Sequence, residues 1–176
     1  RFCLRKWLLC HDSRFCQWPT VRNSTIANVK SGINLMSGSR NLVVEDSAIS
    51  VVAQGAGNDT YGIRFGSASG ITENMSIIGG NISVDKNGLA ADAGIYHSAI
   101  VIRSASGVLS IDGMAIDGEI VNLSSTSLDA SPNWWGSAAG PYLGQILGDV
   151  SYMPWCGDAA CSFTVPDEYG RINVPG

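Results

Sequence analysis

The chain has 176 residues, enough for one domain of ordinary size. Charged residues make up 15% of the chain and there are 21 glycines, a composition that favours tight turns and small stacked side chains over a helical bundle. The formal net charge is −4, with 14 Asp/Glu against 6 Lys/Arg from Asn23 onward. This acidic body argues against nucleic acid or an anionic membrane surface as partner, and no apolar run approaches the roughly 20 residues of a membrane span.

Residues 1–20 differ in composition from the rest. They hold three of the five cysteines and two of the five tryptophans. They are interpreted either as a cap over one end of the fold or as a non-native or fragmentary segment. Their apolar core is too short for a signal peptide. Because the chain does not begin with Met, we expect it to be part of a larger parent chain.

A six-residue phrase recurs along the next hundred residues. It reads VRNSTI from Val21, VEDSAI from Val44, IIGGNI from Ile77 and IDGMAI from Ile111, and a decayed copy, LDASPN, starts at Leu128. The third position of each full copy is Asn, Asp or Gly, the residue types that most readily adopt a left-handed backbone conformation. Each copy therefore predicts two short extended runs separated by an abrupt bend, with apolar ends facing inward.

A second phrase precedes three of the copies. It reads GINL from Gly32, GIRF from Gly62 and AIVI from Ala99, and its alternation places two large apolar side chains on one face. Strand, turn, strand and bend, repeated without helical periodicity, predict an all-β parallel β-helix, a solenoid of about four to five coils over residues 21–135.

The solenoid is expected to end in an aromatic C-terminal cap. Trp134 and Trp135 lie in the stretch LDASPNWWGSAAG and are large enough to cover the last coil. An uncapped stack would leave backbone edges unpaired, which makes this structural interpretation preferable to sugar stacking. Residues 136–176 are therefore interpreted as a capping and tail segment, in which VSYMPW can lie across the same end.

The end motif, Asn-Trp-Trp-Gly followed by Gly-Pro and then Tyr-x-Pro-Trp, resembles the C-terminal end of right-handed parallel β-helix repeat proteins of the pectate-lyase-like architecture. The resemblance spans roughly residues 21–155 and implies a right-handed coil and an extracellular or cell-surface location. Such proteins are common among secreted and surface-anchored bacterial and archaeal chains. They include adhesin-like proteins as well as polysaccharide lyases and hydrolases.

Two long links leave the same corner of consecutive coils, between Ile49 and Gly62 and between Ile82 and Ala99. In solenoids such insertions often carry binding, although they can equally be solvated loops without a role. An ordered groove between the two links would favour binding of carbohydrate or of another cell-surface component. The candidate binding residues in these links are Asn58, Asp59, Tyr61, Asp85, Lys86, Asn87, Asp92, Tyr96 and His97.

An enzymatic role would require paired carboxylates, or a calcium site beside a basic residue. The phrase alignment places Asp112 and Asp129 on neighbouring coils, while Arg64 and Arg103 are outward candidates that could grip an acidic saccharide. These residues are more simply interpreted as solvated surface charges. No cofactor is expected, although calcium is possible, and two histidines without ligand-like spacing argue against zinc.

Cys156 and Cys161 enclose four residues, which suggests a small disulfide loop, with a free pair or a weak metal site as alternatives. The favoured hypothesis is a secreted or cell-surface β-helix segment that binds or displays without catalysis. The alternatives are a fragment of a polysaccharide lyase or glycoside hydrolase, and a structural spacer.

Overall fold

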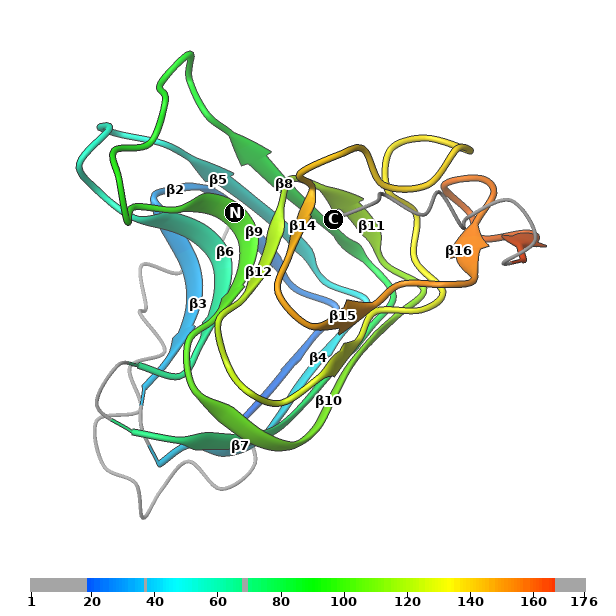
Figure 1. Cartoon of the computed structure of the whole chain (residues 1–176), viewed down its shortest axis with the longest axis horizontal. Coiled ribbons are helices and arrows are strands. Elements are labelled where there is room, and N and C mark those ends of the chain that lie inside the picture. The colour runs from blue at the N-terminus through cyan, green and yellow to red at the C-terminus, as the bar shows by residue number, and fades with distance from the viewer. Residues whose placement is uncertain (1–18, 37, 68–69, 167–176) are drawn as a thin grey trace, which may run out of the picture.

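The computed structural model describes residues 19–166 except 37 and 68–69 (Figure 1). Nearly all of the atypical segment 1–20 therefore lies outside the described residues. The described part is all-β and contains strands, turns and links without an α-helix. Accordingly, no helix in this part is long and apolar enough to cross a membrane.

Three parallel sheets hold most of the strands. Sheet A consists, in spatial order, of β1 (Thr20–Arg22), β4 (Arg40–Glu45), β7 (Thr72–Ile78), β10 (Ala105–Asp112), β13 (Leu128–Asp129) and β15 (Val150–Ser151). Sheet B consists of β2 (Thr25–Val29), β5 (Ala48–Val52), β8 (Asn81–Asp85) and β11 (Ala115–Asp117). Sheet C consists of β3 (Ser31–Leu35), β6 (Thr60–Phe65), β9 (His97–Ile102), β12 (Ile120–Asn122) and β14 (Ile146–Leu147). A separate antiparallel pair joins β16 (Trp155–Cys156) to β17 (Thr164–Val165).

The chain visits sheets A, B and C in turn, and each passage is called a circuit below. Circuits 1 to 5 span residues 20–35, 40–65, 72–102, 105–122 and 128–147. In circuit 5 the place of a sheet B strand is taken by a single parallel bridge from Trp134 to Ala115. This order is compatible with a parallel β-helix solenoid. Parallel pairing continues through β14 and β15, beyond the predicted boundary at residue 135.

The predicted bends are confirmed by the backbone. Asn23, Asp46, Gly79 and Gly113 have φ values of 46°, 46°, 63° and 64°, and each lies between a strand of sheet A and one of sheet B. The sheet A strands before the bends are stacked in register, with Val21, Val44, Ile77 and Ile111 as successive Cα partners. The recurring Asn, Asp or Gly therefore turns the chain at the same corner of each circuit.

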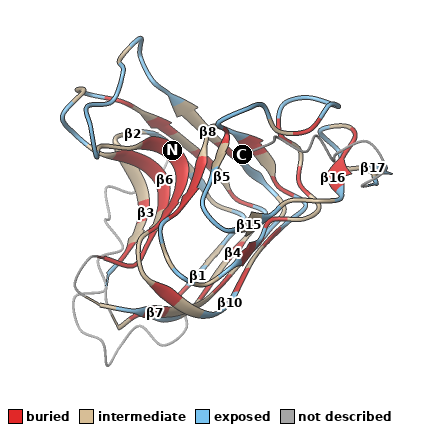
Figure 2. Cartoon of the chain, viewed as in Figure 1, coloured by how far each residue is buried: buried red, intermediate tan, exposed pale blue. Residues whose placement is uncertain are grey.

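The core lies inside the three sheets, where Figure 2 shows the buried residues concentrated in the strands. The large residues of the second phrase face inward as predicted, and none is more than 3% exposed. They are Ile33, Leu35, Ile63, Phe65, Ile100 and Ile102. Circuits 1 to 3 place these residues at equivalent positions, and Ile120 continues one of the two columns in circuit 4. Each of these circuits therefore buries its apolar side chains against the next.

The aromatic end differs in part from the prediction. Trp135 is buried in the core and meets Tyr152 edge to face at 6.4 Å between ring centroids, and Trp155 is buried in the same cluster. Trp134 is only half-buried, because it occupies the bridge position beside Ala115. Trp135 and Trp155, together with Tyr152, therefore cover the apolar interior at this end.

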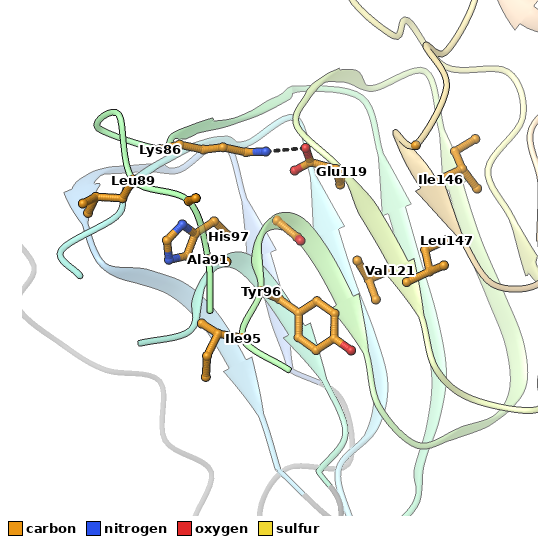
Figure 3. A pocket seen from close by; sticks show the side chains of 13 residues that line it. Lys86, Leu89, Ala91, Ile95, Tyr96, His97, Glu119, Val121, Ile146 and Leu147 are labelled. Atoms are coloured by element: carbon orange, nitrogen blue, oxygen red, sulfur yellow. Dashed lines mark hydrogen bonds and ion pairs between the residues drawn. The ribbon is translucent and has the colours of Figure 1, made fainter. Parts of the chain in front are cut away.

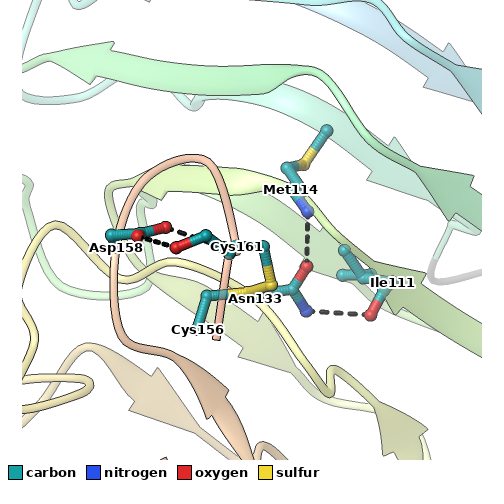
Figure 4. Close-up of a disulfide and its surroundings, with 7 residues drawn as sticks. Ile111, Met114, Asn133, Cys156, Asp158 and Cys161 are labelled. Atoms are coloured by element: carbon teal, nitrogen blue, oxygen red, sulfur yellow. Dashed lines mark hydrogen bonds between the residues drawn. A yellow bond between two sulfur atoms is a disulfide. The ribbon is translucent and has the colours of Figure 1, made fainter. Parts of the chain in front are cut away.

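Asn133, the Asn of the end motif, has a structural role (Figure 4). Its buried side chain accepts a 2.9 Å hydrogen bond from the Met114 amide and donates a 2.8 Å bond to the Ile111 carbonyl. It thereby satisfies backbone groups at the bend of the preceding circuit. The nearby β16 is tied to the following loop by a disulfide between Cys156 and Cys161, the pairing suggested by their spacing.

Candidate functional site

Three long links leave the fold at one corner, where the chain passes from sheet B to sheet C. The first, second and third corner loops comprise residues 53–59, 86–96 and 136–145 and belong to circuits 2, 3 and 5. The same corner is short in circuit 1, where only Lys30 intervenes, and in circuit 4, where Gly118 and Glu119 intervene. The first two loops project together from the body at the upper left of Figure 1.

The first and second corner loops are joined by hydrogen bonds. The Asp92 amide donates to the Ala56 carbonyl at 3.1 Å, and the Tyr96 amide donates to Asp59 Oδ1 at 3.0 Å. The buried His97 places Nε2 3.3 Å and 3.2 Å from the carbonyls of Gly55 and Asn58. These contacts draw the loops together, so the groove described next lies on the other side of the second corner loop and not between the two predicted links.

The groove, with a volume of about 440 Å³, lies between the second and third corner loops. Its floor is the short corner of circuit 4 and the outer face of sheet C, so two long links flank one short link. Figure 3 shows Lys86 reaching toward Glu119, with Tyr96 close to Val121. The residues that line the groove are Lys86, Leu89, Ala90, Ala91, Ile95, Tyr96, His97, Ser98, Glu119, Val121, Gly144, Ile146 and Leu147.

Glu119 is the polar centre of this groove. Its Oε1 accepts two hydrogen bonds, one from Lys86 Nζ at 2.5 Å, which is also an ion pair, and one from the Tyr142 hydroxyl at 3.0 Å. Its Oε2 is buried and has no hydrogen-bond partner among the described residues. Partial burial of the phenol, followed by the charge and hydrogen bond of Glu119 and the charge of Asp117, raises the pKa of Tyr142 to about 12. One carboxylate thus connects the second and third corner loops.

The apolar part of the groove continues beneath Tyr96. Tyr61, Val101 and Val121 form a buried cluster on the outer face of sheet C, and Tyr96 packs against it. The Arg103 guanidinium carbon lies 5.4 Å from the centroid of the Tyr96 ring, within cation–π range. Tyr96 therefore contacts both the cluster and Arg103, and it joins the groove to the arginines of the same face.

The predicted binding residues divide into three groups. Lys86, Tyr96 and His97 line the groove. Asn58, Asp59 and Tyr61 lie outside it, around the first corner loop and the adjoining strand. Asp85, Asn87 and Asp92 are exposed.

Asp112 and Asp129 lie on neighbouring strands but are not directly opposite each other. Asp129 pairs in register with Ser110, two residues before Asp112, because the fifth copy of the phrase is displaced along sheet A. Arg103 forms an ion pair with Asp59 at 3.2 Å, whereas Arg64 lies over the Tyr61 ring at 5.8 Å. Within the described ranges, no three His, Cys, Asp or Glu side chains converge as a metal site would require.

Sequence reasoning missed the other half of the groove, which includes Glu119, Val121, Ile146 and Leu147. It also missed Tyr142, which donates a hydrogen bond to Glu119. The usable signal was the near absence of a link after Ile116, because one short corner between long ones leaves a hollow. The placement of Tyr142 had no such signal.

Comparisons with protein-family models, curated proteins and solved structures gave no match for this chain. The pectate-lyase-like resemblance therefore rests on the end motif alone, and the order of the parallel sheets is compatible with a β-helix in general.

Proposed function

We propose that this chain is a segment of an extracellular, right-handed parallel β-helix that binds a saccharide without transforming it. The observation that carries the proposal is the groove between the second and third corner loops. It combines an apolar surface with charged groups, which suits a ligand that has both C–H faces and hydroxyls.

Each part of the groove has a role in this proposal. Tyr96 and Leu147 supply apolar surface for the face of a sugar ring, and Lys86 and Glu119 supply a donor and an acceptor for its hydroxyl groups. The hydrogen bonds that tie the second corner loop to the first hold Tyr96 in place before a ligand arrives. Such preorganisation lowers the entropic cost of binding.

The location and the absence of turnover have separate support. A disulfide between Cys156 and Cys161 is expected in an oxidising compartment such as the cell exterior. A binding role is preferred over the lyase or hydrolase alternative because, among the described residues, the groove is lined by one carboxylate, Glu119, whereas a glycosidase uses two.

The test is a binding screen of the whole chain against immobilised neutral glycans, with and without calcium. Leu147→Glu places a charge in the groove, and Val108→Glu is the matched control, since the two residues are 52% and 70% exposed and Val108 lies on sheet A, outside the groove. We expect Leu147→Glu to weaken glycan binding by at least about tenfold and Val108→Glu to leave it unchanged.

Three outcomes contradict the proposal. Equal binding by Leu147→Glu and the wild type would place the ligand elsewhere. Release of unsaturated or shortened saccharides would favour the enzymatic alternative. If the chain binds no glycan, the remaining hypothesis is that it is a structural spacer.

A further inference from the structure

Arg64 differs from every other basic residue in the described part of the chain. That part contains six lysines and arginines. Four of them form ion pairs, Arg22 with Glu45, Arg40 with Glu73, Lys86 with Glu119 and Arg103 with Asp59. Lys30 donates a hydrogen bond to Asn58. Arg64 has neither an ion pair nor a hydrogen bond within the described residues, although the body of the protein is acidic.

The surroundings of Arg64 hold its side chain in place without neutralising it. Its guanidinium carbon lies 5.8 Å from the centroid of the Tyr61 ring, which is buried. Its Cα partners on the neighbouring strands are Asn34 and Val101, both uncharged. Arg64 Nε and Asn34 Oδ1 are buried and have no hydrogen-bond partner among the described residues. A cation is therefore positioned on the outer face of sheet C with its charge unpaired.

A second arginine, Arg103, has its backbone close by on the same face. Arg103 follows β9 two residues after Val101, and its amide donates to the carbonyl of Phe65, which adjoins Arg64. Asp59 pairs with Arg103, so the three charged groups Arg64, Arg103 and Asp59 sum to one positive charge. Arg103 Nε is also buried, and it has no hydrogen-bond partner in the described part of the chain.

From this arrangement we infer that Arg64 is the centre of an oxyanion-binding site that accepts a carboxylate or sulfate group. A guanidinium presents parallel N–H donors that match two oxygens of such a group, and the cation–π contact with Tyr61 helps to hold it in place. The negative charge of the bound carboxylate or sulfate would balance the one positive charge of Arg64, Arg103 and Asp59 taken together. The site lies outside the groove, and the inference goes beyond the proposed function and does not require it.

The experiment measures binding of the whole chain to inorganic sulfate, dextran sulfate and neutral dextran by calorimetry at low and high salt. Arg64→Gln removes the charge and keeps an amide, Arg64→Lys keeps the charge and removes the fork, and Arg40→Gln removes a paired arginine as the matched control. Thermal unfolding of each variant checks that the fold is intact.

We expect dextran sulfate to bind the wild type, more weakly at high salt, and neutral dextran not to compete. Arg64→Gln should weaken sulfate binding by about tenfold or more, Arg64→Lys by less, and Arg40→Gln by no more than about twofold. If Arg64→Gln loses binding of inorganic sulfate, the ligand of the site is identified as a small free anion. Loss of polymer binding alone would assign a polymer-borne group, and either result supports the site.

Equal affinity of Arg64→Gln and the wild type for dextran sulfate would overturn the inference. So would an equal loss in Arg40→Gln, or no binding of either sulfate probe to the wild type. Failure of the groove variant Leu147→Glu to affect glycan binding would concern the proposed function alone, because Leu147 lies on β14 and Arg64 on β6.

Discussion

Glu119 sets the electrostatics of the groove because one of its oxygens accepts from two donors on different loops. Lys86 begins the second corner loop and Tyr142 belongs to the third, and both meet Glu119 Oε1. A carboxylate held in this way joins three links that are far apart in the sequence. Partial burial of the phenol, followed by the charge of Glu119, raises the pKa of Tyr142 and makes the phenol resist ionisation.

The first prediction concerns the ionisation of Tyr142. Its pKa is raised from 10.0 to about 12 by partial burial and by Glu119, so Glu119→Gln should move the pKa back toward the ordinary value of about 10. The measurement is an ultraviolet titration of phenolate, with Tyr142→Phe identifying the residue's own transition. An unchanged titration in Glu119→Gln would show that Glu119 does not control the phenol.

The same pKa shift has a consequence for stability. Because the folded protein holds the phenolic proton more tightly than the unfolded chain, this contribution is complete below pH 10.0 and is lost as the pH rises through about 12. In Tyr142→Phe, the free energy of unfolding should not show this decrease when it is measured between pH 10 and 12.

At the scale of strands and bends, the close stacking of circuits restricts which residues fit at a corner. Gly80 has φ +80°, and a Cβ added there would lie 2.2 Å from the Ser47 carbonyl oxygen of the circuit below. Gly88 has a similar φ of +67° but lies in the second corner loop with no atom within 4 Å of its added Cβ. The two glycines share a backbone conformation, but only Gly88 has free space around the position of a Cβ atom.

The second prediction uses this matched pair. Gly88→Ala should cost about 1–2 kcal/mol, the cost of a left-handed conformation, whereas Gly80→Ala should cost more than about 3 kcal/mol because the backbone of Ser47 cannot move away cheaply. Urea unfolding of both variants measures the difference. Equal destabilisation would mean that circuit spacing at this corner is looser than the structure indicates.

For the whole molecule, stability depends on continuous burial across the circuits. Ile49 is fully buried in circuit 2, where β5 pairs with β2 on one side and β8 on the other. A charge at this point cannot reach water without separating the neighbouring circuits. The effect should therefore spread through the stack and not remain within one strand.

The third prediction is that Ile49→Asp destabilises the protein by more than about 4 kcal/mol, enough to abolish cooperative thermal unfolding. Val108→Asp, at a position that is 70% exposed on β10, should change stability by no more than about 0.5 kcal/mol. Circular dichroism during heating compares the two variants. A wild-type transition for Ile49→Asp would contradict the register described for sheet B.

The all-β class, the bends at Asn23, Asp46, Gly79 and Gly113, and the inward residues of the second phrase follow from the sequence by itself, since left-handed turn residues and period-two alternation are local properties of the backbone. The shared corner of the first two loops follows from the repeat. Only the tertiary structure decided the rest.

In particular, the displacement of Asp129 by two residues results from packing at the end of the stack, where Asn133 binds the preceding bend and Trp135 enters the core. The meeting of Lys86, Glu119 and Tyr142 likewise depends on how three circuits stack. Such contacts between separate circuits are long-range, and no local pattern in the sequence encodes them.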